Sequence, residues 1–114
     1  MEEVEKIFKA LSDSSRLRII RMLQEKSLCV CEIREVLQLA NSTVSQHLSI
    51  LKEIGFIVES RDGKWVNYTI NPRPNNPIIS SILAMLVFWL NNNEVLENDF
   101  KKICCVDRNL LCNK

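Results

Sequence analysis

Five cysteines in two groups are the residues of this chain most suited to chemistry. Cys29 and Cys31 are separated by one residue, and Cys104, Cys105 and Cys112 stand near the C-terminus. Residues two apart on a regular helix point about 200° away from each other, so the first two thiols can meet one ion only in a frayed or extended turn. We therefore expect this pair at the start of a helix, where backbone dipoles lower a thiol pKa and favour the metal-binding thiolate.

The thiols are expected to be reduced. The acidic residues 1–5 are unlike a secretory signal peptide, which is basic and then apolar, so we expect a cytoplasmic protein. The longest apolar run, 82–90, stays below the roughly 18 residues of a membrane span even when it is extended back to 78. An odd number of cysteines in such a chain argues against a disulfide framework and leaves thiolates for metal or redox chemistry.

Composition favours one small globular domain and argues against an enzyme. The chain has 114 residues, of which 46% are hydrophobic and 25% charged. Its 15 Lys and Arg nearly balance 14 Asp and Glu, so any DNA binding must come from local placement of side chains. With 2 Gly and 1 His there is no glycine-rich phosphate loop and no nucleophile, base and acid set.

The elements that must position the thiols begin with four helices. Apolar residues recur at helical spacing from Val4 to Leu11, and Val44, Leu48 and Leu51 form the clearest later stripe. Gly55 stands where a left-handed C-terminal cap is expected. Helices are thus predicted at residues 3–11, from a cap at 12–15 to about 24, from the Cys29 and Cys31 turn to about 39, and from a cap at Asn41 or Ser42 to about 54.

A β-hairpin and a fifth helix follow. Residues 57–60 and 65–70 are rich in β-branched and aromatic residues, and the Asp62-Gly63 pair between them is a hairpin signal. Asn76 as cap and Pro77 in the first turn would open a helix that is apolar nearly all round. Residues 91–93 either end this helix or form a weak point in one long helix, and the pattern leaves both open.

This order of elements is typical of a winged helix-turn-helix, a mainly α fold with a small β-hairpin. With the apolar stripe inward, the outer side of the fourth helix holds Ser42, Gln46 and Ser49, flanked by Thr43 and Ser45. Hydroxyls and an amide suit a DNA major groove. His47, about 60° from the apolar centre, either reaches a phosphate or packs at the helix shoulder, and Arg61 and Lys64 bracket the hairpin tip, where a wing contacts DNA.

Four blocks resemble the ArsR/SmtB family of winged-helix metalloregulators. They are ALSDSSRLRII (10–20), CVCEI (29–33), STVSQHLSILK (42–52) and DGKWVNY (62–68), and they occur in the order found in that family. The resemblance covers residues 3–98, so we divide the chain into a DNA-binding and dimerisation domain, 1–98, and a cysteine-containing extension, 99–114. It implies a homodimer joined through the first and last helices that represses its operon on double-stranded DNA until an inducer releases it.

The resemblance also implies a thiophilic inducer. Arsenic-responsive members carry Cys-Val-Cys before the recognition helix and a third Cys three residues on, but this chain has Arg34 there. Trivalent arsenic or antimony prefers three thiolates. Either Cys29 and Cys31 bind with Cys104 or Cys105, or Cys104, Cys105 and Cys112 form a complete trithiolate.

Three alternatives remain open at this stage. Cadmium or lead could use four thiolates, whereas a nitrogen-rich zinc site is disfavoured because the only histidine is His47. A redox repressor would form a disulfide with Cys104 or Cys105 and need no ion. A small metal-buffering protein would use the thiols but would give the polar fourth helix and the hairpin no purpose.

Overall fold

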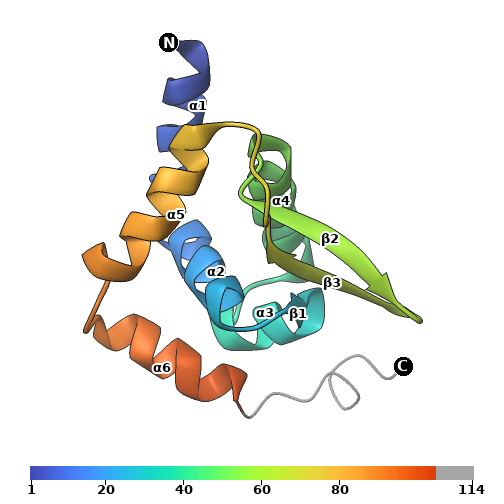
Figure 1. The fold of residues 1–114 in the computed structure, drawn as a ribbon. Helices are drawn as coiled ribbons and strands as arrows, with labels where there is room; N and C mark the ends of the chain where they lie inside the picture. Colours follow the sequence, from blue (N-terminus) through green and yellow to red (C-terminus); the bar gives the residue numbers. More distant parts are fainter. Residues whose placement is uncertain (105–114) are drawn as a thin grey trace.

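Six helices and a small sheet make up the computed structural model, which describes residues 1–104 (Figure 1). The expected mainly α fold with a β wing is confirmed. The helices are α1 (Glu2–Leu11), α2 (Ser14–Glu25), α3 (Val30–Leu37), α4 (Asn41–Ile54), α5 (Pro77–Trp89) and α6 (Glu94–Ile103); the strands are β1 (Leu28–Cys29), β2 (Ile57–Asp62) and β3 (Trp65–Ile70).

Helix α2 lies at the centre, with the other helices around it (Figure 1). Ile19, Ile20 and Met22 have no exposed surface. Asp13 is its N-cap, and the carboxylate accepts hydrogen bonds from the backbone N–H groups of Ser15 and Arg16. Burial opposes ionisation, but these hydrogen bonds, together with the electrostatic interactions with His47 and Arg16, prevail and lower the pKa of Asp13. The expected capping of this helix is therefore confirmed.

The wing has three strands rather than the two that the sequence predicted. The order is β1-β3-β2, all antiparallel, and Leu28 and Cys29 of β1 pair with Tyr68 and Asn67 of β3. A strand of two residues is too short to produce an alternating pattern, so only its pairing with β3 reveals it. The residues just before α3 thus belong to the wing sheet.

The connection between α3 and α4 is short, and α4 begins earlier than predicted. Gln38 adopts a left-handed conformation (φ 57) and donates its backbone N–H to the Arg34 carbonyl at 2.8 Å. The N-cap of α4 is then Ala40, without a side-chain cap, and the predicted cap at Asn41 or Ser42 is wrong. Because the chain turns early, both of those side chains lie exposed on the first helical turn.

Residues 91–93 separate two helices and do not lie within one long helix, the two possibilities that the sequence left open. Asn76 caps α5 with Pro77 in its first turn, as predicted, and α5 ends at Trp89. Asn93 then caps α6 by accepting from the Leu96 backbone N–H at 3.2 Å. Within the described part of the chain no single helix is long and apolar enough to cross a membrane; α5 and α6 meet that test only as a pair, bent by 102°.

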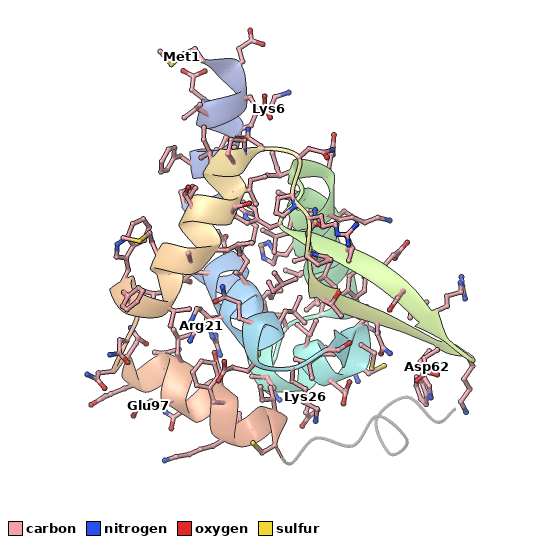
Figure 2. The ribbon with its side chains drawn as sticks, in the orientation of Figure 1. Met1, Lys6, Arg21, Lys26, Asp62 and Glu97 are labelled. Atoms are coloured by element: carbon pink, nitrogen blue, oxygen red, sulfur yellow. The ribbon has the colours of Figure 1, made fainter. Side chains whose placement is uncertain are left out.

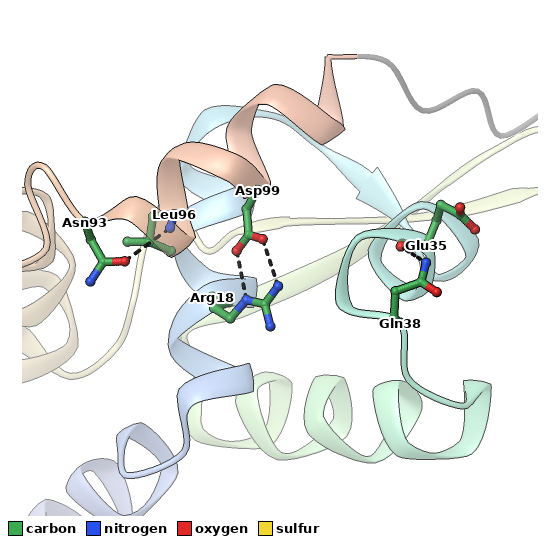
Figure 3. Close-up of polar contacts among 6 residues, drawn as sticks. All are labelled: Arg18, Glu35, Gln38, Asn93, Leu96 and Asp99. Carbon is green, nitrogen blue, oxygen red and sulfur yellow. Dashed lines mark hydrogen bonds and ion pairs between the residues drawn. The ribbon is translucent and has the colours of Figure 1, made fainter.

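Charged side chains of α2 and of Lys26, its C-cap, hold α6 in place. Arg18 donates from Nε and Nη2 to both carboxylate oxygens of Asp99, at 2.9 and 2.8 Å (Figure 3). The Arg21 guanidinium lies 5.3 Å from the centre of the Phe100 ring, and Lys26 Nζ donates to the Ile103 carbonyl at 3.2 Å. Asp99 is 1% exposed, so its charge depends on Arg18.

We expect Asp99→Asn to lower the free energy of unfolding by about 2 kcal/mol, because it leaves the Arg18 guanidinium without its bidentate partner. The loss stays below that of a fully buried pair since the Arg18 side chain is 25% exposed. Urea unfolding followed by circular dichroism measures it. Glu59→Gln, which removes the exposed Lys52 and Glu59 pair, is the control and should leave the midpoint unchanged. Equal midpoints for Asp99→Asn and the wild type would contradict the assignment.

Candidate nucleic-acid interface and thiol site

The outer face of α4 carries the polar residues that the helical geometry placed there. Val44, Leu48 and Leu51 are buried. The exposed candidates for reading DNA are Ser42, Thr43, Ser45, Gln46 and Ser49. Since α4 has no side-chain N-cap, its first-turn N–H groups are also open to an outside acceptor such as a phosphate.

His47 is half-buried on the flank of α4 rather than on its outer face. Its Nδ1 lies 3.1 Å from Nη1 of Arg16, at the start of α2. Arg16 also donates from Nε to the Ala10 carbonyl at 2.6 Å. Through Nδ1 the ring therefore contacts the shoulder between α2 and α4, which is one of the two contacts expected for it. The other, with a phosphate, stays a prediction.

The wing tip is tighter than predicted. Asp62 of β2 pairs with Trp65 of β3, so only Gly63 and Lys64 form the turn, with Gly63 at φ 62. Figure 2 shows Asp62 at the tip, far from the core. Arg61 and Lys64 are exposed, and Lys64 Nζ lies 5.0 Å from the centre of the Trp65 ring. Both cations are thus presented to solvent at the end of the hairpin.

An ion pair joins α4 to the wing. Lys52 Nζ lies 2.8 Å from Oε1 of Glu59, and this hydrogen bond lowers the pKa of Glu59 and raises that of Lys52. Both side chains are exposed, so the pair contributes little to stability. Tyr68, opposite Glu59 in the ladder, has a raised pKa because it is partly buried. The pair thus connects strand β2 of the hairpin to α4.

Cys29 is the N-cap of α3, which confirms the expectation that the first cysteine pair lies at a helix start. Its backbone N–H donates to Oε1 of Glu32 at 3.0 Å, in a capping box. The side chain is 3% exposed, and burial raises the pKa of its thiol. The expected lowering of the pKa by the helix dipole is therefore wrong for Cys29, since desolvation outweighs the dipole.

Cys31 is half-buried in the first turn of α3, beside the wing. With Cys29 it lines a pocket of about 300 Å³, completed by Val30, Lys64, Trp65 and Val66. Cys31 is disulfide-bonded in this structure, whereas Cys29 and Cys104 are free. A thiolate pair at this position therefore requires the reduced protein.

The second cysteine group is only partly described. Cys104 is exposed at the C-terminal end of α6, whereas Cys105 and Cys112 lie outside the described residues. Within residues 1–104 no three His, Cys, Asp or Glu side chains are gathered as a metal site. The described structure thus does not bring Cys104 into one site with Cys29 and Cys31.

The sequence reasoning missed Arg16 and Trp65. A cation in the first turn of a helix opposes the helix dipole, so Arg16 at the third position of α2 was a signal that another contact holds it there. Trp65 lines the thiol pocket only because β1 pairs with β3, and no local pattern contained that information.

In the fully reduced protein we expect iodoacetamide to modify Cys104 faster than Cys29. Cys104 is exposed, whereas Cys29 is buried and its raised pKa leaves less thiolate at neutral pH. The Cys29 rate should rise with pH as the thiolate forms. Time-resolved alkylation with peptide mass spectrometry measures both rates, and a Cys29 rate equal to that of Cys104 at neutral pH would contradict the burial.

Comparison with known proteins places the chain in a family. The model for the bacterial regulatory protein, arsR family, matches residues 13–59. The arsenical resistance operon repressor of Bacillus subtilis is 32% identical over 87 residues, which cover 75% of this chain and 83% of that protein. An arsenic resistance transcriptional regulator of Pseudomonas putida is 39% identical over 67 residues, 58% of this chain and 52% of that protein. The chain therefore spans about half the length of that second relative.

A cadmium resistance regulatory protein homolog of Staphylococcus aureus is 39% identical over 70 residues, 60% of this chain and 58% of that protein. Among solved structures, the transcriptional repressor BigR from Xylella fastidiosa superposes with a TM-score of 0.69 at 25% identity, covering 82% of this chain and 88% of that one. A homodimeric winged helix-turn-helix domain from Mycobacterium bovis gives 0.65 at 22% identity, over 82% of each chain, which shows the fold alone. From these likenesses and the wing and recognition-helix geometry, the chain belongs to the arsR family of bacterial regulatory proteins.

Proposed function

We propose that this regulator is a homodimeric repressor that binds operator DNA and is released by trivalent arsenic or antimony held by cysteine thiolates. The observation that carries the proposal is the double role of Cys29. Its backbone belongs to β1, paired with Asn67 of the wing, while the same residue is the N-cap of α3. A ligand at this thiol therefore acts on the wing and on the helix-turn-helix together.

The DNA contacts are proposed at the outer face of α4 and at the wing tip. Gln46 can pair with adenine, and the serine and threonine hydroxyls can reach bases or phosphates. Arg61 and Lys64 would contact the backbone or the minor groove. The exposure of these side chains and the open N-terminus of α4 support this assignment.

Release follows if the inducer binds better to the conformation with weak DNA affinity. Cys29 and Cys31 would hold the ion as thiolates, which would change the first turn of α3, and the pairing of β1 with β3 would transmit that change to the wing. A coupling of about 1 to 3 kcal/mol would already lower DNA affinity by roughly 5- to 150-fold. The site must be reduced to act in this way, because Cys31 is otherwise occupied.

The third thiolate distinguishes the two binding models. Arg34 cannot supply it. Lys26, three residues before Cys29, donates to the Ile103 carbonyl and so ties the end of α6, next to Cys104, to the strand that leads into the thiol pair. This tether favours Cys29 and Cys31 with Cys104 or Cys105, while a trithiolate of Cys104, Cys105 and Cys112 stays the alternative.

Dimerisation is proposed through α1 and α5. Phe88 is 74% exposed and Trp89 58%, and Phe8 of α1 is 55% exposed. An apolar surface of this kind on two helices needs covering, which a second copy would supply. The expectation from the sequence was the first and last helices, and the helix predicted from Asn76 and Pro77, apolar nearly all round, is α5. The further helix α6 packs against α2.

Other inducers would leave the DNA-binding surface unchanged. The cadmium resistance relative keeps cadmium or lead as alternative ions, and the disulfide of Cys31 favours thiol oxidation as the second candidate mechanism. We propose a cytoplasmic location, where thiols are kept reduced. The division into 1–98 and 99–114 stays a prediction.

We expect Cys29→Ser and Cys31→Ser to bind the promoter fragment like wild type and to lose release by arsenite, because a serine hydroxyl is a poor ligand for a thiophilic ion. Fluorescence anisotropy of the reduced proteins at fixed salt measures both properties, with cadmium, zinc and peroxide as parallel additions. Cys104→Ser tests the third ligand. Full release of both single variants by arsenite would exclude the Cys29 and Cys31 site and leave the C-terminal trithiolate, whereas release only by peroxide would support the redox mechanism.

A second pair of variants should distinguish a contact that reads a DNA base from a contact with the DNA backbone. Gln46→Ala should weaken specific binding by about 1 to 3 kcal/mol and leave nonspecific binding unchanged, because a base contact is lost. Lys64→Gln should weaken both and reduce the salt slope by about one phosphate contact. Anisotropy titrations with the promoter and a scrambled duplex at several salt concentrations measure these effects. If Gln46→Ala weakened both duplexes equally, the reading role of Gln46 would be wrong.

A further inference from the structure

One guanidinium connects three helices beside the recognition face. Arg16 stands in the first turn of α2, donates from Nε to the Ala10 carbonyl and from Nη2 to the Lys9 carbonyl at the end of α1, and places Nη1 3.1 Å from His47 Nδ1 on α4. The carbonyl end of α1 carries partial negative charge, which compensates a cation at the N-terminus of α2. Arg16 is therefore held in one orientation before it meets His47.

The chemistry of the pair determines where the imidazole proton lies. An arginine guanidinium has donors and no acceptor, so His47 Nδ1 must accept and carries no proton. The neutral ring then has its proton on Nε2. Among the described residues, the buried side-chain nitrogen that lacks a hydrogen-bond partner is Arg21 Nε. His47 Nε2 is therefore not a fully buried nitrogen with an unsatisfied hydrogen bond. No hydrogen bond joins Nε2 to an acceptor within residues 1–104, although the Asp13 carboxylate lies close enough to interact electrostatically with the ring. Nε2 is therefore left as a donor that an outside acceptor can reach.

The place of His47 suggests the acceptor. It follows the exposed Thr43 by one helical turn, so it lies along the edge of the reading face that is turned toward the corner of α1 and α2. When a recognition helix enters a groove, its flanks lie against the phosphates that border the groove, and these are the commonest acceptors at such interfaces.

We propose that His47 donates its Nε2–H to a DNA backbone phosphate and that Arg16 is the positioning residue that fixes this tautomer. This inference rests on the proposed DNA binding and adds to it a contact by a neutral side chain, oriented from outside the recognition helix.

The chain's only histidine allows a direct test without DNA. In the ¹⁵N-labelled protein, at a pH where the ring is neutral, we expect ring nitrogen shifts of an Nε2–H tautomer with an unprotonated Nδ1. In Arg16→Lys, which keeps the charge but loses the fixed fork, the two nitrogen signals should move toward averaged values. An Nδ1–H tautomer in the wild type, or unchanged shifts in Arg16→Lys, would overturn the proposal.

Binding measurements on the same variants test the phosphate contact. The amide nitrogen of Gln reaches the position of Nε2 and that of Asn the position of Nδ1, so His47→Gln should stay within about twofold of wild type while His47→Asn and Arg16→Lys lose about 3- to 10-fold. Arg16→Lys should add no loss in the His47→Asn background. The salt slope should not change in His47→Gln, because a neutral donor is exchanged for another.

Arg73→Lys, the same substitution at an exposed arginine before α5, is the matched control and should bind like wild type. Equal losses for His47→Gln and His47→Asn, or additive effects of Arg16→Lys and His47→Asn, would overturn the phosphate contact. A wild-type protein that fails to bind any promoter fragment would instead refute the proposed function, and the tautomer result would show separately whether Arg16 sets the ring.

Discussion

The burial of α2 is the constraint on which the other elements depend. Ile19, Ile20 and Met22 lose all contact with water, so α1, α4, α6 and β3 are arranged around this one helix. The polar residues of α2 then act outward from a fixed frame: Arg16 toward the recognition helix, and Arg18 toward α6. A rigid centre of this kind lets small changes at its edges move whole elements rather than deform the core.

The thiol pair lies at such an edge. Cys29 ends the short strand β1, where it pairs with Asn67 of the wing, and it caps α3, where its backbone N–H donates to Glu32 Oε1. One residue thus belongs to both the wing sheet and the start of the helix. Its burial keeps the thiol protonated more than an exposed one. In the proposed mechanism, a thiophilic ligand would have to displace that proton and open the packing around Cys29. It would act as a switch if this cost were smaller in the conformation with weak DNA affinity.

The last two described helices, α5 and α6, divide the remaining surface. Polar and charged contacts from Arg18, Arg21 and Lys26 hold α6 on α2, whereas the exposed aromatic rings of α5 have no partner within the described chain. The 102° bend after α5 makes this division possible, since a continuous helix would carry the α6 residues away from α2. One helix thus closes the protomer, and the other remains available for association.

Local patterns in the sequence determined the four helices of the N-terminal half, the hairpin at Asp62-Gly63, the Asn76 cap and the polar outer face of α4, because spacing and capping chemistry act within a few residues. They also placed Cys29 and Cys31 at a helix start. Tertiary structure alone decided that β1 joins the wing, that α6 folds back onto α2, that burial raises the Cys29 pKa, and that Arg16 meets His47. Each of these depends on residues far apart in the chain that come together only when α2 is buried, and no local periodicity records such contacts.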